Sequence, residues 1–159
     1  MSARRNMLAQ NALVAVVSNV IGQGIEPTRS ISIYLPWAPS VNGYWRHVVM
    51  GKRVATILSE EARAYRKAVA QQVIAQRVPR GSLSGKLAVE ITAYPPDRRD
   101  RDIDNLPKGI LDSLKHANVI RDDADIDDLR IARGPVRKNA GQIHVVVREI
   151  VDAATEEVR

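Results

Sequence analysis

The chain has 159 residues, of which 45% are apolar, and its formal net charge is +6. This length builds one globular domain with a modest core and does not comfortably build two. Cysteine is absent, which excludes disulfides, zinc–thiolate sites and thiol catalysis. Oxygen ligands are then the main means of binding a metal.

The charge is distributed unevenly along the chain. The interval 97–128 contains ten aspartates, no glutamate and six basic residues, whereas the remainder contains 18 bases against eight acids. A positive body with one concentrated acidic patch suits a protein that holds a polyanion and places divalent cations at one spot on it.

Residues 1–29 are predicted to form a helical extension and a linker. Apolar residues recur there at intervals of three and four and stop before Gly22: Leu8, Leu13, Val16, Val17, Val20 and Ile21. The run 12–21 superficially resembles a signal peptide, but it contains Ser18 and Asn19 and lacks a clear cleavage site. It is also too short and too polar to span a bilayer. We therefore expect an amphipathic helix that packs on the domain or on a partner subunit.

Strand and helix patterns alternate from residue 30 to residue 150. Strand patterns cover 31–35, 86–94, 128–135 and 142–150, and a hairpin covers 44–58 around Gly51-Lys52. A helix capped by Ser59 extends to about Gln76, with one stripe formed by Ala62, Tyr65, Val69, Val73 and Gln76. A second helix is predicted over 105–116, and the polar tail 151–159 is expected to fray.

This order of elements predicts the fold class. We expect a single α+β domain over residues 30–150, with a mixed or mostly antiparallel sheet, two packed helices and the extra N-terminal helix.

The acidic segment carries the candidate chemistry. Asp102 and Asp104 are two residues apart, so an extended or bridging backbone directs both side chains to one side, just before the helix that Asp104 or Asn105 would cap. Lys108 follows Asp104 by four residues, which is one helical turn. Asn118 suits the left-handed conformation that ends helices, and the chain then turns towards Asp123.

Several interpretations of these aspartates remain open. The carboxylates could bind one or two Mg²⁺ or Mn²⁺ ions, or they could serve as helix caps and turn residues. A calcium-binding EF-hand loop starting at Asp123 is disfavoured, because Asp128 takes the place of its glycine and Gly134 that of its final glutamate. The intervening helix would span roughly 20 Å. Asp123 therefore joins the other aspartates only if its strand runs back beside the strand 86–94, or if another subunit contributes to the site.

The stretch DRRDRDIDNLPKGILDSLKHANVIRDDADIDDLRI closely resembles the signature of RusA-type Holliday junction resolvases, which are metal-dependent endonucleases found largely in bacteria and their phages. LPWAPSVNGYWRH is similar to the proline-rich strand and turn of that family, and LSEEARAYRKAV is similar to its first helix. The resemblance covers residues 31–149. Asn118 differs from the family, which usually has glycine at that turn, and Pro107 lies within the motif at a tolerated first-turn position.

The resemblance implies a catalytic set of Asp102, Asp104, Lys108 and Asp123. The three aspartates would hold Mg²⁺, with Mn²⁺ as a substitute, and Lys108 would contact the scissile phosphate. It also implies a homodimer that resolves branched DNA such as four-way junctions during recombination and repair, in the cytoplasm of a bacterium or as a phage product. The alternative is a non-catalytic protein that binds branched DNA and has a structural metal site.

Further basic residues are candidates for DNA binding. Arg98, Arg99 and Arg101 flank the acids and would contact phosphates, or would relieve carboxylate repulsion. Arg46, Lys52 and Arg53 lie on the predicted hairpin and could track a duplex arm. We expect three nearby aromatic residues to pack in the core or in turns, and His144 to be structural: Trp37, Tyr44 and Trp45.

Overall fold

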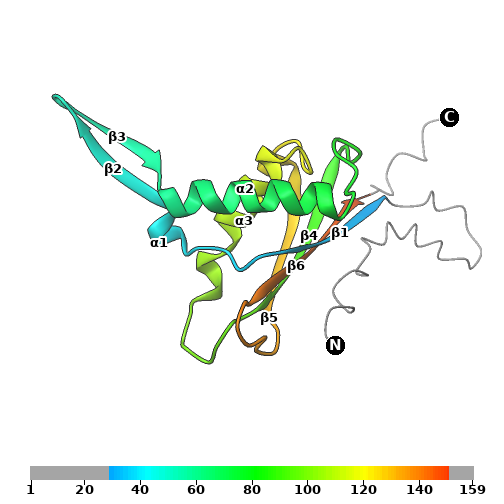
Figure 1. Ribbon diagram of the computed structural model, residues 1–159. Helices are drawn as coiled ribbons and strands as arrows, with labels where there is room; N and C mark the ends of the chain where they lie inside the picture. Colours follow the sequence, from blue (N-terminus) through cyan, green and yellow to red (C-terminus); the bar gives the residue numbers. More distant parts are fainter. Residues whose placement is uncertain (1–28, 151–159) are drawn as a thin grey trace, which may run out of the picture.

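A computed structural model describes residues 29–150 (Figure 1). The predicted helix in the N-terminal extension and the polar tail 151–159 lie outside the described residues. The elements are β1 (Ser30–Leu35), α1 (Val41–Tyr44), β2 (Trp45–Met50), β3 (Arg53–Leu58), α2 (Glu60–Ala75), β4 (Lys86–Tyr94), the 3₁₀ turn η1 (Ile103–Asn105), α3 (Pro107–His116), the 3₁₀ turn η2 (Asp123–Asp125), β5 (Ile126–Arg133) and β6 (Gln142–Ile150).

The main sheet has four strands in the order β1-β6-β4-β5. β6 pairs antiparallel with both β1 and β4, whereas β5 pairs parallel with β4 and places Ile126 beside Leu87. α3 lies in the crossover between the two parallel strands. The predicted α+β domain with a mixed sheet is therefore confirmed. β2 and β3 form a separate hairpin that projects from the body of the molecule (Figure 1).

The core lies between the main sheet and the helices α2 and α3. Alternate residues of β1, β4 and β6 are buried against α2 and α3. The residues between them point to the other face of the sheet, which no helix among residues 29–150 covers. The predicted stripe on α2 is confirmed, because Ala62, Tyr65, Val69 and Val73 are all buried.

Gln76 extends this stripe and covers the free edge of β1. Its Nε2 donates to the Tyr34 carbonyl at 2.6 Å, and its Oε1 accepts from the Tyr34 amide at 2.9 Å. The side-chain amide thus pairs with the backbone as a neighbouring strand would, which protects an otherwise open sheet edge.

The helix ends agree only in part with the sequence-based expectations. Ser59 caps α2 as predicted, its Oγ accepting from the Ala62 amide at 3.1 Å, and Asn118 has the predicted positive φ of 57°. The predicted capping of α3 by Asp104 or Asn105 is wrong. A turn of 3₁₀ helix comes first, and α3 begins at Pro107 with Leu106 before it and no side-chain cap. Proline favours the first helical position because its φ is preset and it has no amide hydrogen to satisfy.

The aromatic residues and His144 occupy packing positions. Tyr44 is fully buried at the end of α1, Trp37 packs against the edge of the core, and Trp45 remains 37% exposed. His144 lies within hydrogen-bonding distance of Ser32 Oγ, at 2.8 Å, and stacks on Tyr34. Its predicted structural role is confirmed. None of the helices among residues 29–150 has the length and apolar character needed to cross a membrane.

Candidate active site

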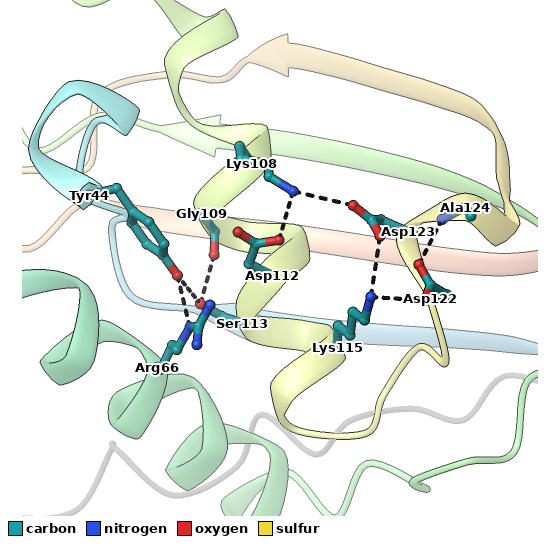
Figure 2. A network of polar contacts seen from close by, with 10 residues as sticks. All are labelled: Tyr44, Arg66, Lys108, Gly109, Asp112, Ser113, Lys115, Asp122, Asp123 and Ala124. Atoms are coloured by element: carbon teal, nitrogen blue, oxygen red, sulfur yellow. Dashed lines mark hydrogen bonds and ion pairs between the residues drawn. The ribbon is translucent and has the colours of Figure 1, made fainter. Parts of the chain in front are cut away.

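The centre of the candidate site is a cluster of lysines and aspartates from α3 and η2 (Figure 2). Lys108 Nζ lies 3.0 Å from Asp112 Oδ1 and 3.3 Å from Asp123 Oδ2. Lys115 Nζ lies 2.9 Å from Asp122 Oδ2 and 3.5 Å from Asp123 Oδ1. Each oxygen of Asp123 therefore faces one lysine of α3, an arrangement that we call the lysine clasp.

The helical geometry of α3 explains the lysine clasp. Lys108, Asp112 and Lys115 follow one another at spacings of four and three residues, so they share one face of α3. η2 places Asp122 and Asp123 opposite that face, and Asp122 also accepts the Ala124 amide at 3.2 Å. These partners perturb the ionisation of the cluster: hydrogen bonding to Asp112 raises the pKa of Lys108, and hydrogen bonding to Lys115 lowers the pKa of Asp122. Both shifts favour the charged forms of Lys108 and Asp122.

Asp102 and Asp104 lie in the loop before α3, and both are exposed. The backbone of Asp102 is extended, with φ −76° and ψ 123°, whereas Asp104 lies within the 3₁₀ turn η1. The structure therefore brings Lys108 to Asp123. It does not bring Asp102 or Asp104 into contact with either residue.

The direction of β5 explains this separation. β5 does run beside β4, as one interpretation of the sequence required, but it is parallel to β4 and its first residue, Ile126, lies beside Leu87 at the start of β4. The loop that contains Asp102 follows the far end of β4. Asp123 and Asp102 thus approach the candidate site from opposite ends of the parallel pair.

The loop between β4 and η1 is held by Asp97. This carboxylate accepts two hydrogen bonds from the Arg101 guanidinium and one from the Arg99 amide at 2.9 Å. The bonds from Arg101 are the main cause of the lowered pKa of Asp97. The Arg101 guanidinium also lies over the Trp37 ring, 5.8 Å from the ring centroid. Arg133 donates a hydrogen bond to the carbonyl oxygen of Arg101. Arg101 therefore orders this loop.

The other predicted DNA-binding residues lie on the surface. Arg98 and Arg99 are exposed in the loop after β4. Arg46 and Arg53 lie on the same face of the β2–β3 hairpin, because Arg53 pairs with Met50 and alternate residues of a strand share a face. Lys52 lies in the turn of the hairpin. Each of these side chains is accessible to a large anionic partner.

A surface hollow of about 650 Å³ adjoins the acidic loop. It lies between the segment that follows β1, the helix α2 and the loop 100–106, and Asp102 is one of its lining residues. Sequence reasoning missed this hollow, because its walls come from three segments that are distant along the chain.

Sequence reasoning also missed a hydrogen-bonded contact between Tyr44 and α3. Tyr44 Oη accepts a hydrogen bond from Arg66 Nε at 3.1 Å and lies 3.4 Å from Ser113 Oγ, which donates to the Gly109 carbonyl at 2.7 Å (Figure 2). The Tyr44 ring packs directly on Gly109. A glycine inside a predicted helix was the available signal, since such a glycine often marks a close approach.

The donor chemistry of the aspartates fits a hard divalent cation, because carboxylate oxygens are the ligands that Mg²⁺ and Mn²⁺ prefer. Among residues 29–150, however, no three acidic or histidine side chains are grouped in a way that could hold a metal ion. Asp123 is paired with lysines, whereas Asp102 is approached by the Asn105 amide at 3.5 Å. The assignment of metal ligands to Asp102, Asp104 and Asp123 stays a prediction.

The fold and the site together define a small α+β domain with a carboxylate and lysine site at a parallel βαβ crossover. The protein-family model described as Endodeoxyribonuclease RusA matches residues 36–148. The chain belongs to the RusA family.

Individual relatives agree with this assignment. The chain is 38% identical over 116 residues to a crossover junction endodeoxyribonuclease of Enterobacteria phage HK97, covering 73% of this chain and 92% of the relative. It is 39% identical over 119 residues to the RusA crossover junction endodeoxyribonuclease of Escherichia coli strain K12, covering 75% and 94%. The matching enzyme of Enterobacteria phage 82 is 38% identical over 118 residues, covering 74% and 93%.

Proposed function

We propose that this protein is a metal-dependent endonuclease that resolves Holliday junctions and related branched DNA in recombination and repair. The observation that carries the proposal is the RusA family match over residues 36–148, which includes all four predicted catalytic residues. The similar proteins of phage HK97 and Escherichia coli are named crossover junction endodeoxyribonucleases. We expect this protein to act in the cytoplasm of a bacterium or on phage DNA.

In this proposal Lys108 contacts the scissile phosphate. Its side chain is 51% exposed, and Asp112 and Asp123 hold its ammonium group in place. The raised pKa keeps this group charged at neutral pH. An ammonium group held in this way can donate to a phosphate oxygen and can stabilise the negative charge that develops during hydrolysis.

Asp102, Asp104 and Asp123 would hold Mg²⁺, or Mn²⁺ in its place. A bound cation of this kind neutralises charge on the phosphodiester and makes water a stronger nucleophile. The overall reaction adds water across one ester bond: the water oxygen bonds to phosphorus, the bond to one sugar oxygen breaks, and that oxygen gains a proton.

The exposed arginines and the hairpin would bind the DNA backbone. We assign this role to Arg98, Arg99, Arg46, Lys52 and Arg53, because exposed basic side chains contact phosphates and so position a duplex. Arg101 would contribute charge while it orders the loop. We also propose a homodimer, because two identical subunits related by a two-fold axis match the symmetry of a four-way junction and can nick paired strands.

The alternative is a non-catalytic protein that binds branched DNA and has a structural metal site. The specific observation in its favour is the lysine clasp, in which both oxygens of Asp123 face ammonium groups. A carboxylate neutralised in this way is a structural ion pair unless a cation displaces its partners.

Cleavage of an end-labelled four-way junction separates the two functions. The assay compares the junction with linear duplex of the same sequence, with Mg²⁺ or with EDTA, and compares wild type with Asp104→Asn. Asp128→Asn is the matched control, since this partly exposed aspartate pairs only with Arg130 among the contacts of residues 29–150. Paired nicks that require Mg²⁺, occur only in the junction, and disappear in Asp104→Asn alone support resolution. Tight junction binding without nicks in either Mg²⁺ or Mn²⁺ contradicts it.

A further inference from the structure

Asp123 differs from Asp112 and Asp122 in how closely the lysines of α3 approach it (Figure 2). Lys108 lies closer to Asp112, at 3.0 Å, than to Asp123, at 3.3 Å. Lys115 likewise lies closer to Asp122, at 2.9 Å, than to Asp123, at 3.5 Å. Each lysine therefore has a nearer carboxylate of its own, and Asp123 is the more distant second partner of both.

The contact between Lys115 and Asp123 is the longest of these four. Its 3.5 Å exceeds the length of about 2.9 Å that a charged donor and a carboxylate favour. The two side chains are 42% and 38% exposed, so water screens their attraction. Lys115 can therefore leave Asp123 at little cost in free energy, because it keeps its closer contact with Asp122.

Asp122 is held in a position that keeps Lys115 in place after such a change. Its Oδ1 accepts the Ala124 amide at 3.2 Å, which caps η2, and its Oδ2 lies 2.9 Å from Lys115 Nζ. The backbone thus fixes one side of the carboxylate while the other side binds the lysine. Because Asp122 and Asp123 are adjacent in the chain, Lys115 also offsets the repulsion between their two negative charges.

We infer that Lys115 is a displaceable counterion of Asp123. Lys115 neutralises Asp123 Oδ1 before a divalent cation binds and withdraws to Asp122 when Asp123 takes up the cation, while Lys108 stays at Asp123 Oδ2. The inference rests on the proposed function, in which Asp123 is a metal ligand, and deepens it. Lys115 becomes a positioning residue whose ammonium group competes with Mg²⁺ or Mn²⁺ for the carboxylate and so sets the affinity of the site for its cation.

Lys115→Met should strengthen cation binding, whereas loss of a merely structural lysine would weaken it or leave it unchanged. Methionine keeps most of the length of the side chain and removes its charge. The dissociation constant for Mn²⁺ should fall roughly fivefold, the factor that corresponds to the loss of one competing, half-exposed ion pair. Lys115→Arg keeps the charge and should bind Mn²⁺ as wild type does. Lys67→Met, at an exposed position of α2, is the control that removes the same charge elsewhere.

Asp122→Asn should change cation binding in the opposite direction. The amide oxygen of asparagine can still accept from the Ala124 amide, but a neutral group holds Lys115 less strongly. Lys115 then stays on Asp123, and Mn²⁺ binding becomes weaker. In Lys115→Met the same substitution should have a much smaller effect, because the lysine that it would release is absent. A double-mutant cycle over Lys115 and Asp122 measures this coupling.

Three measurements on the full-length protein test these expectations. Mn²⁺ binding is measured without DNA and without turnover, from the electron paramagnetic resonance signal of free Mn²⁺. The rise in melting temperature on adding Mn²⁺ should be larger for Lys115→Met than for wild type, because tighter binding to the folded state stabilises that state more. The cleavage rate of a four-way junction should reach half its maximum at a lower Mg²⁺ concentration in Lys115→Met than in wild type.

Two outcomes overturn the inference. One is cation binding that is unchanged or weaker in Lys115→Met, with urea unfolding showing that the variant is folded. The other is an effect of Asp122→Asn that is equally large with and without Lys115. Either result leaves the proposed function standing if wild type still cuts the junction. Failure of the wild-type protein to cut any junction in Mg²⁺ or Mn²⁺ contradicts the proposed function itself.

Discussion

Replacing Gly109 by alanine should destabilise the protein, although alanine is the better helix former. Gly109 is the third residue of α3, next to Lys108, and its φ is not positive. Helix propensity alone therefore predicts a gain of about 1 kcal/mol for Gly109→Ala. Packing predicts the opposite sign, because a β-carbon at this position would lie 3.0 and 3.2 Å from two carbons of the Tyr44 ring.

The balance depends on whether the Tyr44 ring can move. Tyr44 is fully buried, and its hydroxyl is held by Arg66 at 3.1 Å and by Ser113 at 3.4 Å. A ring fixed at both ends cannot retreat by a few tenths of an ångström without breaking these contacts. Overpacking of a fixed core costs about 1–3 kcal/mol. The net loss in the free energy of unfolding is therefore expected to be about 1 kcal/mol, with an upper bound of about 2 kcal/mol.

Urea unfolding measures this loss as a lower transition midpoint with an unchanged slope. The control is Gly43→Ala in α1, where the added β-carbon meets Glu61 Oε2 at an ordinary 3.7 Å and no loss is expected. In a Tyr44→Phe background the ring loses its hydroxyl contacts, so Gly109→Ala should cost less there than in wild type. A Gly109→Ala protein more stable than wild type would refute the reasoning.

Three further predictions concern capping and ionisation. Ser59→Ala removes the N-cap of α2, whose Oγ accepts the Ala62 amide, and should lower the free energy of unfolding by about 1 kcal/mol in chemical denaturation. Arg101→Met removes the main cause of the lowered pKa of Asp97, so the Asp97 carboxyl should titrate at higher pH in NMR. Because this pKa is lowered on folding, the wild-type ion pair stabilises the protein above the unfolded pKa of about 4 and is lost as the pH falls through the folded pKa. Burial lowers the pKa of His144, so the stability of the folded protein should fall as the pH drops below about 6.5. Melting temperatures measured at pH 7.5 and pH 5.5 should therefore differ less in His144→Gln than in wild type.

The elements that the sequence predicted correctly are those marked by local signals. Ser59 is followed three residues later by the amide that it caps, and the buried stripe of α2 repeats within the same helix. Asn118 follows α3 and has a positive φ, a conformation that asparagine tolerates. Each of these features depends on residues within a few positions of one another, so a single sequence contains the information.

The position of Asp123 depends on information of another kind. Its distance from Asp102 is set by the parallel pairing of β5 with β4, which joins residues about forty positions apart, such as Leu87 and Ile126. The eight residues of β5 contain no local signal that shows whether the strand runs parallel or antiparallel to β4. The hollow was missed for the same reason, since Trp37, Ala68 and Asp102 come together only in the folded chain.

Lys108 illustrates how one local difference changes the expected contacts. The residue lies four positions after Asp104 and four before Asp112, so helical spacing alone allows a pair with either aspartate. Because α3 starts at Pro107, Asp104 lies outside the helix and the four-residue rule no longer applies to it. Lys108 therefore pairs with Asp112, and from that position it reaches Asp123 across the βαβ crossover. A proline tolerated at the first helical position thus directs the predicted catalytic lysine towards η2 and away from the loop that holds Asp102 and Asp104.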